Sequence, residues 1–173
     1  MSQRQALDAF LASIGPRALT HVSYGLANRA DAEDIVQNAM IKFVQHYAEK
    51  PEAQWTPLFF KVLYTQKMDF FRKTPLASAL NRVKHWLSTD GVDEMDSQAD
   101  DSQPDLEMEL SDAGEQLEQR LNVLPERQRE ALMLRVWEGL DVKQTALAMR
   151  CSEGSVKTHL SRAMQTLNIG GEN

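Results

Sequence analysis

The chain has 173 residues, which is enough for one ordinary domain or for two small helical ones. Its single cysteine, Cys151, allows no internal disulfide. There is no charged-then-apolar leader and no apolar run long enough to cross a bilayer, so we expect a cytoplasmic protein without direct membrane insertion. Few Gly and Pro residues and many segments with helical periodicity predict an all-α fold.

The net charge of −6 is distributed unevenly along the chain. Twelve of the 25 acidic residues lie between Asp90 and Glu118, where there is no Lys or Arg, so the rest of the chain has 13 acids against 19 Lys and Arg. Residues 88–104 contain almost no large apolar side chains and cannot bury enough surface to fold. We interpret them as an acidic flexible linker between a domain at residues 1–87 and a second domain at residues 105–173.

The first domain is predicted to begin with three helices. The first should run from Gln3 to Ser13, end at Gly15-Pro16, and be followed by a second from Arg17 to Asn28. Asp31 should cap a third, long helix. Its apolar stripe comprises Ile35, Val36, Ala39, Met40, Phe43, Val44 and Tyr47. The opposite face is polar, which is more typical of a solvated surface than of a functional one, and it carries Asp34, Gln37, Asn38, Lys42 and Gln45.

The next predicted helix, which Thr56 should cap and which runs to Lys73, is rich in aromatic residues. Its apolar side chains cover more than half of the helix circumference, so we expect some of its aromatic rings to be partly exposed. A polar stripe holds Lys61, Thr65, Asp69 and Arg72, with Lys67 and Lys73 nearby. Rings and cations together suit single-stranded nucleic acid, because bases stack on the rings and the cations pair with the backbone. A deeply buried helix would explain the rings but not the cations.

The stretch from Leu124 to Leu167 has the pattern of a helix-turn-helix. Pro125 and Glu126 should open its first helix, and Gly139 should close it. A short helix from Val142 to about Met149 follows. Residues 150–152 then separate it from a third helix, for which Ser152 is the expected N-cap.

The third helix of this stretch has an apolar face and a free face. The apolar face comprises Val156, Leu160, Ala163, Met164 and Leu167. The free face has no carboxylate and offers hydroxyls, an amide and two cations, from Ser155, Lys157, Thr158, Ser161, Arg162 and Gln165. Such groups match the base edges and phosphates of a DNA major groove. An ordinary solvated face is the alternative, but it would be expected to include Glu or Asp.

Taken together and in this order, the stretches resemble the bacterial sigma-70 family, in particular its compact extracytoplasmic-function (ECF) group. Residues 31–37 resemble the region 2 stretch that docks on the clamp helices of RNA polymerase, and residues 58–72 resemble the promoter-melting helix. Residues 124–130 and 152–157 resemble region 4. Three positions depart from the family, which usually has Trp at Leu58, Asn at Thr65 and Gly at Arg150.

The resemblance implies a subunit that binds core RNA polymerase and promoter DNA and has neither a catalytic group nor a cofactor. It implies polymerase binding through Asp34, Gln37, Asn38 and Lys42. It implies contacts to the minus-10 element, which region 2 would recognise and melt, through Lys61, Tyr64, Thr65, Arg72 and Lys73. It implies binding of the minus-35 element through Ser155, Lys157, Thr158, Ser161 and Arg162. An anti-sigma factor is a further expected partner, since such proteins are typical of the group.

Two other classes of protein share part of this pattern. Residues 139–159 are also close to the helix-turn-helix of two-component response regulators, but the alternating β and α segments of a receiver domain are missing upstream. A helical metal-dependent enzyme would need ligands at characteristic spacings. None of the four His residues follows a Glu by three positions, and no His-Glu-x-x-His occurs, so no metal site is expected.

Overall fold

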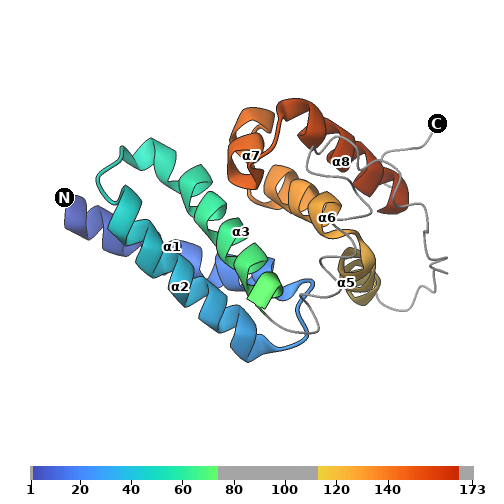
Figure 1. The fold of residues 1–173 in the computed structure, drawn as a ribbon, viewed down its shortest axis with the longest axis horizontal. Helices are drawn as coiled ribbons and strands as arrows, with labels where there is room; N and C mark the ends of the chain where they lie inside the picture. Colours follow the sequence, from blue (N-terminus) through green and yellow to red (C-terminus); the bar gives the residue numbers. More distant parts are fainter. Residues whose placement is uncertain (1, 74–112, 168–173) are drawn as a thin grey trace. The chain divides into compact units, whose positions relative to one another are not determined.

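The computed structural model describes residues 2–73 and 113–167, and the chain divides into two compact units (Figure 1). Every regular element in these two ranges is helical, which confirms the predicted all-α class. The acidic residues up to 112 and the predicted domain boundaries near residues 87 and 105 lie outside the described ranges. Within those ranges, no helix is long and apolar enough to span a bilayer.

The N-terminal unit consists of α1 (Gln3–Ser23), α2 (Arg29–Tyr47), the short 3-10 helix η1 (Glu52–Gln54) and α3 (Trp55–Lys73). In Figure 1, α2 runs alongside α3, and it packs against both α1 and α3. Aromatic rings from all three helices meet in the core. The ring centroids of Phe10 and Trp55 are 5.3 Å apart, and those of Phe43 and Phe59 are 5.7 Å apart. Such pairs contribute about 0.5–1.5 kcal/mol each beyond the burial of their area.

Contrary to the predicted break at Gly15-Pro16, α1 is one continuous helix with Pro16 inside it. Pro16 lacks an N–H and so removes one backbone hydrogen bond. The helix nevertheless continues because Ile14, Ala18 and Val22, spaced four residues apart, are all fully buried. A break would lose the burial of Ala18 and Val22, which lie beyond it.

Gly15 serves close packing in this helix and does not form a turn. A Cβ atom added to Gly15 would lie 3.0 Å from the terminal methyl group of Met40 on α2. The absence of a side chain therefore lets α1 and α2 approach each other closely. In the sequence alone, the adjacent Gly and Pro look like a turn signal.

We predict that Pro16→Ala stabilises the N-terminal unit. The substitution restores a backbone N–H to the middle of α1, and Pro16 is exposed, so little packing is lost. The free energy of unfolding should rise by about 1–3 kcal/mol. Chemical denaturation of the full chain followed by circular dichroism measures the change. A decrease in stability would mean that the proline ring itself holds the helix in its packed geometry.

The helix starts in this unit differ from two predictions. Asn28 and not Asp31 caps α2, because its side-chain oxygen accepts a hydrogen bond from Ala30 N at 2.7 Å. Asp31 lies in the first turn, where a carboxylate is also favourable. The third long helix already begins at Trp55, directly after η1, and Thr56 is therefore inside it. Both errors are shifts of one to three residues at a helix end, where several polar residues compete for the cap.

The C-terminal unit contains α5 (Ala113–Val123), α6 (Glu126–Leu132), α7 (Val142–Met149) and α8 (Glu153–Leu167). A five-residue π-helix, η3 (Met133–Trp137), continues α6. It ends before Gly139, which has φ +73°, as expected for a residue that stops a helix. The predicted bounds of α7 and the separation of α7 from α8 by residues 150–152 are confirmed. The last helix, α8, packs on both α6 and α7.

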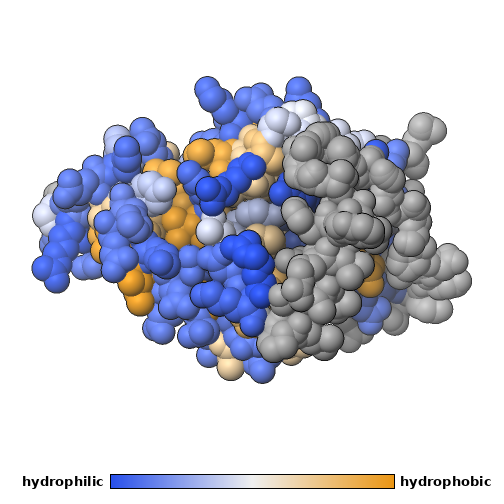
Figure 2. All heavy atoms as spheres, viewed as in Figure 1, coloured by the Kyte–Doolittle hydropathy of each residue, from blue (hydrophilic) through white to orange (hydrophobic). Residues whose placement is uncertain are grey.

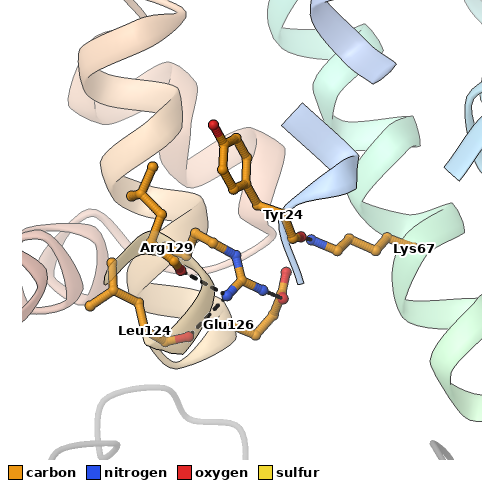
Figure 3. A network of polar contacts seen from close by, with 6 residues as sticks. Tyr24, Lys67, Leu124, Glu126 and Arg129 are labelled. Carbon is orange, nitrogen blue, oxygen red and sulfur yellow. Dashed lines mark hydrogen bonds and ion pairs between the residues drawn. The ribbon is translucent and has the colours of Figure 1, made fainter. Parts of the chain in front are cut away.

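Two arginines connect α5 to the rest of this unit. Arg129 is buried, donates hydrogen bonds to the carbonyl oxygens of Leu121 (3.3 Å) and Leu124 (3.0 Å), and pairs with Glu126 (Figure 3). These bonds satisfy carbonyls at the end of α5 and fix its junction with α6. From α5, Arg120 donates to the carbonyl of Leu167 at 2.9 Å, which caps the C-terminus of α8.

Candidate functional site

Capping hydrogen bonds define both ends of α7 and the start of α8. At the start of α7, Asp141 accepts a hydrogen bond from Gln144 N at 2.7 Å, and the Gln144 side chain accepts one from Asp141 N at 3.0 Å. At the end of α7, Arg150 adopts the left-handed conformation with φ 58° and ψ 47°. Ser152 then caps α8, because its hydroxyl oxygen accepts a bond from Ser155 N at 3.0 Å. The predicted N-cap is thus confirmed.

The free face of α8 is largely where the sequence predicts it. Lys157, Ser161 and Gln165 are exposed, and Thr158 and Arg162 lie half-buried at the edge of the face. Ser155 does not belong to this face. It is only 3% exposed, and its hydroxyl accepts a bond from Ser152 Oγ at 3.1 Å, so the prediction that it is available for contact is wrong. Ser155 stands three residues after the N-cap, and the capping hydroxyl of Ser152 bonds to its backbone N–H, which explains the burial.

The opposite side of α8 forms part of the core of the unit. Val156, Ala163 and Leu167 are buried, whereas Leu160 and Met164 are only half-buried. His159 is 2% exposed on the same helix and is not among the residues predicted for the apolar face, although it stands three residues after Val156 and four before Ala163. The pKa of His159 is lowered from 6.5 to about 4, chiefly by burial and in addition by the positive charges of Arg127 and Arg162. This imidazole is therefore neutral at pH 7.

We predict that the C-terminal unit loses stability in acid through His159. Above pH 6.5 the imidazole is neutral in both the folded and the unfolded chain. Between pH 6.5 and about 4 only the unfolded chain binds the proton, so the free energy of unfolding falls as the pH falls, by about 3 kcal/mol in total. Denaturant unfolding of the wild type and of His159→Gln at several pH values measures the difference. Equal pH slopes for the two proteins would contradict the buried, neutral state.

On α3, the predicted polar stripe is present, but part of its positive charge is paired with a carboxylate of the same helix. Lys61 and Thr65 are half-buried, and Arg72 and Lys73 are exposed. The hydroxyl of Thr65 donates to the carbonyl of Lys61 at 2.9 Å, one turn earlier on the same helix. Arg72 pairs with Asp69 on the same stripe. An exposed pair of this kind contributes little to stability, so the guanidinium can exchange Asp69 for another anion at low cost.

The aromatic residues of α3 divide into a buried group and a half-buried pair. Trp55, Phe59, Phe60 and Tyr64 are buried. Phe70 and Phe71 are half-buried, with ring centroids 5.7 Å apart. The expectation of partly exposed rings is thus confirmed for Phe70 and Phe71. Tyr64, which the resemblance assigns to the minus-10 contacts, is only 4% exposed and is therefore not available at the surface.

The cation Lys67 is buried and does not belong to the surface stripe. It is 1% exposed, and its Nζ donates to the carbonyl of Tyr24, just beyond the end of α1, at 3.3 Å (Figure 3). A lysine at the C-terminus of a helix interacts favourably with the negative end of the helix dipole. Lys67 therefore ties α3 to the end of α1, whereas the sequence pattern had grouped it with the exposed cations.

The polar face of α2 is exposed and also carries large apolar side chains. Asp34, Gln37, Asn38 and Lys42 are all exposed, as predicted from their helical spacing. Ile41 is 53% exposed and Val44 39% exposed, so the assignment of Val44 to the buried stripe is wrong. The signal for Ile41 is its position four residues after Gln37. Where α2 and α3 lie in Figure 1, the space-filling view in Figure 2 shows apolar spheres at the surface between hydrophilic ones.

Comparisons with known proteins give a family match for the C-terminal unit and a structural match for the fold. Residues 114–167, which extend from α5 to the end of α8, match the family described as Sigma-70, region 4. The chain also resembles the sigma factor RpoE from Bartonella quintana, solved in complex with the anti-sigma factor NepR. The TM-score is 0.59 and the identity 19%, over 96% of this chain and 99% of that one. None of the curated proteins matches the sequence. Among the described residues, no group of three or more His, Cys, Asp or Glu side chains could hold a metal ion.

Proposed function

We propose that this chain directs promoter-specific initiation of transcription as a subunit of RNA polymerase. Its C-terminal unit matches sigma-70 region 4, and its fold resembles that of a sigma factor. The observation that carries the proposal is the exposed face of α8, which offers Lys157, Ser161 and Gln165, extends to Arg162 at its edge, and has a carboxylate, Glu153, only in the first turn of the helix. Its chemistry matches DNA, and a region 4 domain provides the frame that presents it.

The proposed contact of the C-terminal unit is the minus-35 element. In a helix-turn-helix the second helix lies in the major groove, and here that helix is α8. Lys157 and Arg162 would pair with phosphates or with guanine edges, and Thr158 and Ser161 would hydrogen-bond to bases. Ser155 is not proposed as a contact, because its hydroxyl is part of the N-cap.

The proposed contact of α2 is core RNA polymerase. Its exposed face combines Asp34, Gln37, Asn38 and Lys42 with Ile41, and Val44 lies at its margin. A protein interface typically has an apolar centre and a polar rim, and scattered polar residues alone would give no reason to expect one. The apolar side chains supply area to be buried, and the polar ones supply orientation.

We expect Asp34→Lys to weaken binding to core polymerase, because it reverses a charge within this face without changing a buried residue. Co-elution of the full chain with core polymerase on a sizing column measures the effect, and circular dichroism checks that the helical content is unchanged. Asp8→Lys, the same charge change at an exposed position of α1, is the matched control and should co-elute like the wild type. Undiminished co-elution of the Asp34 variant would remove this face from the interface.

The proposed contact of α3 is the melted minus-10 element. Unstacking bases costs a few kcal/mol per step, which must be offset by stacking on rings and by charge near the backbone. Phe70 and Phe71 are the partly exposed rings, and Lys61, Arg72 and Lys73 are the cations. Thr65 already donates its hydroxyl proton to Lys61, so towards a base it would act as an acceptor.

We expect Lys61→Ala and Arg72→Ala to reduce promoter opening more than promoter binding. With the polymerase holoenzyme, permanganate reactivity of thymines in the minus-10 region reports opening, and a gel shift reports binding. Lys50→Ala, which removes an exposed cation beyond the end of α2, should leave both unchanged. A premelted template should restore the variants. If they remain equally defective on a premelted template and also bind polymerase poorly, the melting role is wrong.

The alternative function, a response-regulator-type activator, lacks support upstream of the helix-turn-helix. A receiver domain alternates strands and helices, whereas residues 2–73 contain helices and no strand. Such an activator would bind DNA without replacing the sigma subunit, so its transcription would require another sigma factor in the assay.

We also propose that an anti-sigma factor binds this chain, as one binds the similar RpoE. The C-terminal unit exposes Val136, Trp137 and Leu147, which are 54%, 50% and 42% exposed and which a partner could cover. Purification of the tagged chain from its own cells, with Trp137→Glu for comparison, tests the idea. Recovery with polymerase subunits alone in both cases would contradict it.

A further inference from the structure

Arg150 is the one non-glycine residue with positive φ among the described residues. It is the C-cap of α7, and its left-handed conformation lets Arg150 N and Cys151 N donate hydrogen bonds to the carbonyls of Leu147 and Ala146. Glycine adopts the same conformation without a steric cost, whereas for a residue with a Cβ atom this conformation raises the free energy of the folded state. Neither the capping bonds nor the burial of the turn requires an arginine side chain, since both bonds use backbone atoms and Arg150 is exposed.

The position of Arg150 suggests what its side chain contributes. Lys143 and Leu147 are exposed and stand four residues apart, on one face of α7, and the exposed Arg150 follows as the residue that caps the end of the helix. From Val142 to Gln165 the chain has four Lys and Arg residues and one acid, Glu153. The cations therefore continue from the free face of α8 through the turn and onto α7.

In a helix-turn-helix, the first helix crosses the DNA backbone while the second reads the groove. With α8 in the groove, the end of α7 and the turn after it lie at the level of the phosphates. Arginine presents a planar fork of donors that matches a phosphate, and its long side chain can reach one from the turn.

We propose that Arg150 is a further DNA-binding residue, whose guanidinium pairs with a backbone phosphate of the duplex that receives α8. The proposal rests on the proposed function of the C-terminal unit and deepens it. Arg150 would add affinity for any sequence, whereas the residues of α8 supply sequence preference.

The test separates the charge of Arg150 from its conformation. The full-length chain is titrated with a fluorescent random-sequence duplex at several salt concentrations, and thermal unfolding of each variant is recorded. Arg150→Lys retains the charge and the strain. Arg150→Asn and Arg150→Gly remove the charge and tolerate the left-handed conformation. Arg162→Ala serves as the reference for α8, and Arg4→Ala removes an exposed cation of α1 as the matched control.

DNA binding should follow charge, and stability should follow conformation. At about 0.1 M salt, Arg150→Asn and Arg150→Gly should bind about five- to tenfold more weakly, and the slope of log affinity against log salt should be smaller by about one. Arg150→Lys, which keeps the charge but not the planar fork, should keep the wild-type salt slope and lose less affinity than these two variants, and Arg4→Ala should bind like the wild type. The melting temperature of Arg150→Gly should equal or exceed that of the wild type.

Two results would overturn the proposal, and they differ in what they say of the C-terminal unit. If Arg150→Asn and Arg150→Gly keep wild-type affinity and salt slope while Arg162→Ala weakens binding, Arg150 has no phosphate contact and the role of α8 stands. If the wild-type chain binds no duplex at all, or if neither the Arg150 nor the Arg162 variants differ from it, the DNA-binding role of the whole unit fails together with the proposal.

Discussion

The burial of one side of α8 against α6 and α7 is the constraint on which the C-terminal unit depends. Val156, Ala163 and Leu167 are held in the core, so residues on the opposite side of the helix, such as Lys157 and Ser161, must face outward. Rotation of α8 by one residue would bury Lys157 and expose Val156, which would cost several kcal/mol in desolvated charge and lost apolar burial. The composition of the free face therefore follows from the packing of the other face.

The same principle acts on the N-terminal unit, with a different outcome. The aromatic core of Phe10, Phe43, Trp55 and Phe59 holds α1, α2 and α3 together. A bundle of three helices cannot enclose every apolar residue, and α2 and α3 each keep some at the surface. Ile41 and Val44 on α2 and Phe70 with Phe71 on α3 are among these residues. In the proposed function they become contacts, on one helix with a protein and on the other with unstacked bases.

Local signals in the sequence predict local structure well. The N-cap at Ser152 and the stop at Gly139 depend on bonds within a few residues, and both are found as predicted. Tertiary packing explains the failures. Gly15 and Pro16 look like a turn, but burial on both sides keeps α1 continuous. By sequence position, Lys67 groups with the exposed cations of α3 and Tyr64 with its DNA-contacting residues. Contacts from other helices nevertheless enclose both side chains, and no pattern in α3 alone reveals those contacts.

Run-off transcription tests the central claim most directly. The purified chain is added to core RNA polymerase on a library of genomic promoter fragments, with no other sigma factor present. Our account predicts a set of defined transcripts that core polymerase alone does not make, whose promoters share one upstream and one downstream element at fixed spacing. A transcript pattern identical to that of core polymerase alone, or transcripts that form only when another sigma factor is supplied, would contradict it.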